Sequence, residues 1–218
     1  EQGLALEAYS QTGAYRSIGA SEAAKLGAVA AMNRALGGAN YRLPHTGAMF
    51  YLPDTSKIPA ASITAEDCEM LAYLTAQGPV KMHLTLTPQT LPDAESYNVI
   101  ADVKGSEHPE QIVIVSGHLD SWDLGTGAID DGAGVVMAMQ TVQLMKQLGL
   151  KPKRTIRFIP WINEENGSRG GTTYVQDYAA EVGNHVAAIE ADLGAGHPAG
   201  FFAHASPQAI DRLRPLVP

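Results

Sequence analysis

Hydrophobic and polar positions follow different patterns before and after residue 96. In the first part, Gly and Pro break the chain into short stretches, and apolar residues have helical spacing in two segments, 21–36 and 64–76. We expect Ser21 to cap the first of these helices and Gly37 to end it. The alternation of apolar and polar residues over 80–86 predicts a strand.

After residue 96, apolar strands alternate with amphipathic helices. The predicted strands are 97–104, 111–116, 154–162 and 186–191, and the predicted helices are 132–148 and 170–182. The first two strands flank a turn, so we expect them to pair as a hairpin. Strand, helix and strand repeated in one sheet require right-handed crossovers. The sequence therefore predicts an α/β fold, a mostly parallel mixed sheet with helices on both faces.

Composition narrows the classes of function. The 218 residues carry a formal net charge of -8, which provides no basic surface for nucleic acid. No apolar run approaches the roughly 20 residues that a membrane helix needs, so we expect no membrane span. Cys68 is the only cysteine, so a metal must be bound by His and carboxylate rather than by thiolates. The chain begins Glu-Gln-Gly, and we expect it to be a piece of a longer protein without its signal segment.

Polar side chains follow three of the predicted strands, at the point where each strand ends. These residues are His118 and Asp120, Glu164 and Glu165, and Asp192. An acidic pair, Asp130 and Asp131, precedes the predicted helix that begins at 132. Ligands of open α/β sheets bind outside the carboxyl ends of the strands. We therefore expect these side chains to meet at one edge of the sheet.

This set of residue types suits a zinc site. Imidazole and carboxylate are the zinc ligands other than thiolate, and one carboxylate can bridge two ions about 3.5–4 Å apart. Asp120 lies two residues after His118, so on an extended segment its carboxylate could accept the second ring N–H of the imidazole. Of the neighbours Glu164 and Glu165, one could bind metal while the other faces the attacking water as a general base.

Each residue also has an ordinary structural explanation. His118 could be a hydrogen-bonded core residue, Asp131 a helix cap and Asp192 a turn residue, while the glutamate pair could be a solvated strand end. Convergence favours the metal, because several carboxylates at one edge would repel one another unless a cation lay among them.

Four segments then resemble a known family. Residues 117–123 (GHLDSWD), 127–134 (GAIDDGAG), 163–167 (NEENG) and 190–192 (EAD) resemble the co-catalytic zinc exopeptidases, which include aminopeptidase Y and carboxypeptidase Q. The first two motifs are most similar to the carboxypeptidase Q branch. The resemblance covers 96 to about 196 and implies the zinc exopeptidase fold. It identifies 96–218 as a catalytic domain that lacks its C-terminal part, and 1–95 as the later part of an inserted protease-associated domain.

The resemblance also implies a role for each site residue. His118 and Asp192 would hold one zinc ion, Glu165 the second, and Asp130 would bridge the two. Asp120 would orient His118, and Glu164 would be the general base. The peptide bond between Asp130 and Asp131 would be cis. The family uses one further His, and His197 and His204 lie too close to Asp192 to match it.

The function implied is hydrolysis of terminal peptide bonds in dipeptides or short peptides, through a hydroxide that bridges two zinc ions. Aminopeptidase action within the same family is the nearest alternative. A non-catalytic binding fragment and a single-zinc cyclase, as in the related glutaminyl cyclases, are two others. The resemblance further implies a homodimer and an exported enzyme.

Overall fold

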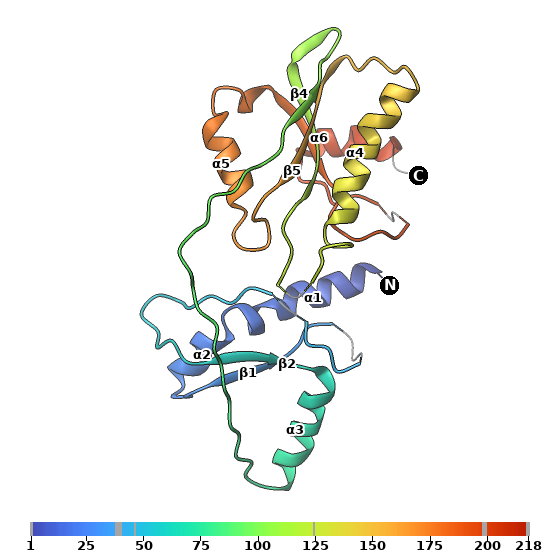
Figure 1. The fold of residues 1–218 in the computed structure, drawn as a ribbon. Helices are drawn as coiled ribbons and strands as arrows, with labels where there is room; N and C mark the ends of the chain where they lie inside the picture. The colour runs from blue at the N-terminus through green and yellow to red at the C-terminus, as the bar shows by residue number, and fades with distance from the viewer. Residues whose placement is uncertain (1, 38–40, 46, 124, 198–199, 217–218) are drawn as a thin grey trace. The chain divides into compact units, whose positions relative to one another are not determined.

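The computed structural model describes residues 2–37, 41–45, 47–123, 125–197 and 200–216. The chain divides into two compact units, Glu1–Ser96 and Tyr97–Pro218. Residues 79–100, between the last helix of the first unit and the first strand of the second, belong to no helix or strand (Figure 1). The strand expected over 80–86 is therefore wrong. Extended backbone becomes a strand only where a neighbouring strand completes its hydrogen bonds, and the described chain offers this segment no such neighbour.

The first unit contains three helices and a two-stranded parallel sheet in its described part. Its elements are α1 (Gln2–Ser17), α2 (Gly19–Lys25), β1 (Ala31–Arg34), β2 (Ala60–Ile63) and α3 (Ala65–Gln77). The side chain of Thr64 caps α3 by accepting a hydrogen bond from the Asp67 N–H. The helix predicted over 64–76 is thus confirmed.

The helix predicted over 21–36 is wrong. The helix α2 is only seven residues long, and Gly27, with φ of 85°, follows its end. The next residues form β1, because their backbone pairs in parallel register with β2. Ser21 lies inside α2 and is fully buried, where its Oγ accepts a hydrogen bond from the Leu52 N–H. Neither Ser21 nor Gly37 therefore has the capping role that local spacing suggested.

The second unit is built on a four-stranded sheet of order β3-β5-β4-β6. Its strands are β3 (Ala101–Val103), β4 (His108–His118), β5 (Arg154–Trp161) and β6 (His185–Glu190), and its helical segments are α4 (Gly132–Gln147), α5 (Arg169–Asp177), η1 (Val182–Asn184), α6 (Pro207–Leu213) and η2 (Arg214–Leu216). The strand β4 is parallel to both of its neighbours, and only β3 is antiparallel. Figure 1 shows α4 and α5 on either side of this sheet. The predicted fold class is confirmed.

The expected hairpin of 97–104 with 111–116 does not form. The strand β3 pairs with β5, with Asp102 opposite Arg157. Both edges of β4 are taken by parallel partners, β5 and β6, so no edge remains for β3. Closeness along the chain predicted the wrong neighbour, because the crossover through α4 inserts β5 between the two segments.

A buried arginine joins four elements of this unit. Arg157 donates to both carboxylate oxygens of Asp102, at 2.8 and 2.7 Å, and to the Tyr174 hydroxyl at 2.8 Å. That hydroxyl lies 2.8 Å from Nε2 of His185. The two hydrogen bonds to Asp102 raise the pKa of Arg157. The network ties β3, β5, α5 and β6 together beside a core of Ile112, Ile114, Ile159 and Tyr174.

Among the described residues, no helix has both the length and the apolar character to cross a membrane.

Candidate metal centre

The start of α4 packs directly against the carboxyl ends of β4 and β6. Two glycines permit this approach. A Cβ at Gly117 would lie 2.6 Å from an Asp131 carboxylate oxygen, and a Cβ at Gly134 would collide with the Ala191 carbonyl oxygen. The loop before α4 is thereby held at the same sheet edge as the last residue of β4.

Asp131 fixes this arrangement and has the ordinary role expected for it. Its buried carboxylate caps α4 by accepting the Gly134 N–H at 3.0 Å, and it accepts the His118 N–H at 2.9 Å. Burial raises its pKa, and these two hydrogen bonds oppose that rise. The peptide bond between Asp130 and Asp131 is cis, as the family resemblance implied.

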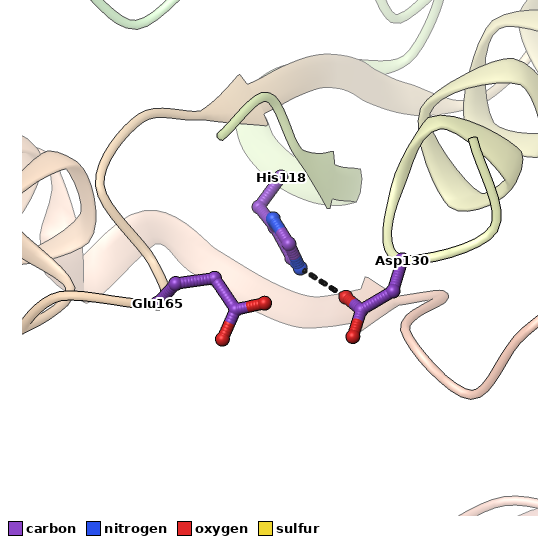
Figure 2. A group of neighbouring side chains, drawn as sticks. All are labelled: His118, Asp130 and Glu165. Atoms are coloured by element: carbon purple, nitrogen blue, oxygen red, sulfur yellow. Dashed lines mark hydrogen bonds and ion pairs between the residues drawn. The ribbon is translucent and has the colours of Figure 1, made fainter. Parts of the chain in front are cut away.

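His118, the last residue of β4, lies at the centre of the site and is 1% exposed. Its Nε2 is 3.0 Å from Oδ1 of Asp130 (Figure 2) and 3.2 Å from Oδ1 of Asp192. Its Nδ1 is 2.9 Å from the backbone carbonyl oxygen of Asp120. A carbonyl oxygen only accepts, so Nδ1 carries the proton that it donates there. In a neutral ring, the lone pair of Nε2 then faces two carboxylate oxygens.

A cation between these acceptors would satisfy them. Without one, a proton on Nε2 can take its place, and the pKa of His118 reflects this. Burial lowers the pKa, but the charge of Asp192 and the other neighbouring acceptors raise it to about 8. Burial also raises the pKa of Asp192, to about 6. A zinc ion bound to Nε2 and to the carboxylates would satisfy all of these groups, so the residues fit the metal that the sequence predicts.

Glu165 completes a second group of possible ligands. One potential ligand atom from each of His118, Asp130 and Glu165 lies within 4.8 Å of the others, and Figure 2 shows both carboxylates directed toward the imidazole. The Oε1 atom of Glu165 is buried and has no hydrogen-bond partner in the described part of the chain. Burial and the charge of Asp130 raise the pKa of Glu165, while the charge of His118 and a hydrogen bond with the Trp122 side chain lower it. An unpaired buried carboxylate oxygen is another feature that a cation would satisfy.

A further group of possible ligands consists of His118, Asp131 and Asp192. One potential ligand atom from each of them lies within 4.8 Å of the other two. Both carboxylate oxygens of Asp131 already accept backbone hydrogen bonds, so His118 and Asp192 are the members of this group that remain available to a cation. No group of possible ligands among the described residues contains His197 or His204.

Asp120 lies differently from the expectation. Its carboxylate does not accept the ring N–H of His118, from which it is 3.8 Å away, because β4 ends at His118 and the alternation of side chains ends with it. Instead it accepts the backbone N–H groups of Glu164 and Glu165, at 2.8 and 3.2 Å. Glu164 lies outside both groups of possible ligands. The roles of Asp120 in orienting His118 and of Glu164 as a base stay predictions.

Without metal, the stability of the chain should fall as the pH rises from about 6.5 to about 9. The pKa of His118 rises from 6.5 in the unfolded chain to about 8 in the fold. Its stabilising charge is therefore fully present below 6.5 and is lost as the pH passes 8. The expected loss is about 1–2 kcal/mol. The check is urea unfolding in the presence of a chelator, followed by fluorescence of Trp122 and Trp161, which both lie in the second unit.

The matched control for this pH dependence is His118→Asn, which has no ionisable ring and should lose most of the fall. The pKa of Asp192 rises from 3.8 in the unfolded chain to about 6 in the fold. Its contribution to the pH dependence of stability therefore lies mainly below pH 6.5. An unsubstituted chain as stable at pH 9 as at pH 6.5 would contradict the charged state assigned to His118.

The fold and the site define a class of protein, an α/β protein with a cluster of His and carboxylate side chains, a candidate metal centre, at the carboxyl edge of a mostly parallel sheet. The chain belongs to Peptidase family M28, which matches residues 98–217. This confirms the family resemblance seen in the four motifs. M28 is a family of peptidases, so the predicted enzyme class is confirmed at the level of the family.

Curated relatives and a solved structure agree with this assignment. The chain is 44% identical over 202 residues to carboxypeptidase Q of Xenopus laevis, covering 92% of the chain and 43% of the relative. It is 43% identical over 194 residues to carboxypeptidase Q of Homo sapiens, covering 88% and 41%. A peptidase M28 precursor from Shewanella amazonensis SB2B superposes with a TM-score of 0.78 at 40% identity, over 87% of the chain and 43% of that structure. The chain thus spans less than half the length of these relatives.

Proposed function

We propose that this site is the metal centre of a zinc-dependent exopeptidase, which hydrolyses terminal peptide bonds of dipeptides or short peptides in the manner of carboxypeptidase Q. One observation carries the proposal. Nε2 of His118 lies 3.0 and 3.2 Å from carboxylate oxygens of Asp130 and Asp192, while a buried oxygen of Glu165 has no partner in the described chain. Relatives named carboxypeptidase Q, at 42–44% identity, support the choice of reaction.

Two zinc ions are proposed, with His118 and Asp192 on one, Glu165 on the other and Asp130 between them. When bound, zinc polarises a carbonyl and makes water a stronger nucleophile at neutral pH. Asp120 holds the backbone of the two glutamates, and its hydrogen bonds leave the Glu164 carboxyl available for proton transfer. Glu164 accepts a proton from the attacking water as the carbon–oxygen bond forms, and it donates that proton to the amine as the carbon–nitrogen bond breaks.

The remaining expectations belong to the same proposal. Residues 96–218 are taken as the peptidase domain and 1–95 as part of a protease-associated domain. The natural enzyme is proposed to be an exported homodimer that acts on peptides. Carboxypeptidase action is preferred to aminopeptidase action because the relatives of highest identity cited above carry the carboxypeptidase name.

The test combines metal analysis with a choice of blocked substrates. After equilibration with zinc and removal of the excess, the 218-residue chain is expected to retain one or two zinc ions per chain by elemental analysis. It is then assayed with an unblocked dipeptide and with a peptide blocked at both ends. Hydrolysis of the dipeptide alone, abolished by a chelator, is the expected result. A chain that retains no zinc contradicts the metal centre, and equal cleavage of the doubly blocked peptide contradicts exopeptidase action.

A further inference from the structure

The two candidate glutamates lie on the 162–170 loop, an irregular segment that leaves β5 and ends in the first turn of α5. Three of its residues have positive φ angles, Asn163 at 60°, Gly167 at 116° and Ser168 at 51°. For the two that are not glycine, this region of backbone space is unfavourable, and it persists only where surrounding contacts hold it. Contacts from outside the loop must therefore hold the backbone that carries Glu164 and Glu165.

One such contact comes from Asn98, a residue in none of the sequence motifs. Its Oδ1 accepts the Ile162 N–H at 3.0 Å, and its Nδ2 donates to the Gly170 carbonyl oxygen at 2.9 Å. An N–H can only donate and a carbonyl can only accept, so these partners fix which way the amide points. The Gly170 N–H also donates to the Ile162 carbonyl oxygen at 3.0 Å. Asn98 thus joins the first and last residues of the loop.

The surroundings of this contact leave little freedom. A Cβ at Gly170 would collide with Oδ1 of Asn98 and with the Ile162 carbonyl oxygen, so the glycine lets the loop ends approach the amide. Asn98 precedes β3, whose antiparallel pairing with β5 carries its backbone past the end of that strand. The amide offers an acceptor and a donor together at this position. Aspartate has no donor, and glutamine has an extra methylene.

The loop is therefore held at two places by two different side chains. Asp120 binds the N–H groups of Glu164 and Glu165 themselves, while Asn98 closes the loop at Ile162 and Gly170. The first contact sets the backbone at the glutamates, and the second fixes where the loop leaves β5 and enters α5. Loss of the second contact would let both glutamates shift together relative to His118, which β4 holds independently.

We propose that Asn98 is a positioning residue of the metal centre, which holds the 162–170 loop closed so that Glu165 faces the metal and Glu164 faces the substrate. The expected effect on zinc binding rests on the proposed function, but the closing of the loop can be measured independently of that function. Outer contacts of this kind typically change metal affinity or activity about 10- to 100-fold when removed.

The experiment compares the unsubstituted chain with Asn98→Ala in two measurements. Hydrogen–deuterium exchange of peptides covering 162–170 reports the closing of the loop, and competition with a chelating dye reports zinc affinity. Asn98→Ala is expected to exchange faster in this loop, with exchange in β4 unchanged, and to bind zinc about 10-fold more weakly. Asn33→Ala is the matched control, because Asn33 is also half-buried and hydrogen-bonded, to Arg34 and Ser62, but lies in the first unit.

A second variant separates hydrogen bonding from packing. Asn98→Asp keeps the size and the acceptor for the Ile162 N–H, but its second oxygen cannot donate to the Gly170 carbonyl oxygen and would be repelled by it. This variant should therefore also exchange faster in the loop and bind zinc more weakly than the unsubstituted chain. If Asn98→Asp matches the unsubstituted chain in loop exchange and in zinc affinity, the proposed role of the two Asn98 hydrogen bonds is wrong. The same comparison tests the proposal if Asn98→Ala does not fold. Unchanged loop exchange or unchanged zinc affinity in Asn98→Ala would likewise overturn the proposal. If the unsubstituted chain binds no zinc, the proposed function fails, and loop exchange alone then decides whether Asn98 closes the loop.

Discussion

Replacement of Glu164 by Gln is expected to lower kcat for dipeptide hydrolysis by at least about 100-fold, while the zinc content stays that of the unsubstituted chain. The amide keeps the shape of the side chain but cannot take a proton from water or return it to the leaving amine. Glu164 is outside both groups of possible metal ligands, so its loss should not release metal. Its backbone N–H bond to Asp120 does not involve the side chain and should persist.

The measurement is steady-state kinetics together with elemental analysis of the same preparation. Glu110→Gln is the matched control, because this exposed glutamate at the start of β4 lies outside the site, and its substitution should change neither quantity. Full activity in Glu164→Gln refutes the assignment of the general base. Loss of zinc in that variant would instead make Glu164 a ligand.

Asp130→Asn should have the second large effect, on metal rather than on proton transfer. Asp130 lies 3.0 Å from Nε2 of His118 and belongs to the group that contains Glu165, so it is placed to contact both proposed ions. Substitution removes one negative charge and one of the two oxygens that a bridging ligand needs. Zinc content is expected to fall by at least one ion per chain, with hydrolysis lost at the same time.

Elemental analysis after zinc equilibration measures this loss, and Asp177→Asn is the control. Asp177 is an exposed residue at the end of α5 and lies outside both groups of possible ligands. Zinc retained at the unsubstituted level in Asp130→Asn argues against bridging. Because Glu164→Gln and Asp130→Asn are expected to lose activity with and without metal respectively, the pair separates the two proposed roles.

Sequence reasoning worked where the relevant interaction is local or follows from strand direction. The helix predicted over 64–76 forms, and the Thr64 cap that begins it joins residues only three apart. The meeting of His118, Asp130, Glu165 and Asp192 follows from parallel strands, whose carboxyl ends lie at one edge. The assignment of Asp131 as a helix cap is likewise a local rule, and the structure confirms it.

Sequence reasoning failed where a distant segment decides the outcome. Residues 31–34 have helical spacing but form β1, because the backbone of β2 is available to them. The strand β3 was expected beside β4 but lies beside β5. Asp120 was expected to bind the ring of His118 but binds the backbone of Glu164 and Glu165, more than forty positions later. Asn98 gave no signal at all, because both of its partners are backbone groups.

By itself, then, the sequence determined the class of the fold, the family and the residue types that meet at the sheet edge. These depend on hydrophobic periodicity, on strand direction and on side-chain chemistry, which are all written in the order of residues. Only the tertiary structure decided which strands are neighbours, which groups Asp120 and Asn98 bind, and that Nε2 of His118 faces two carboxylates. Those features depend on hydrogen bonds between segments far apart in the chain, and backbone groups that complete such bonds look alike in every residue.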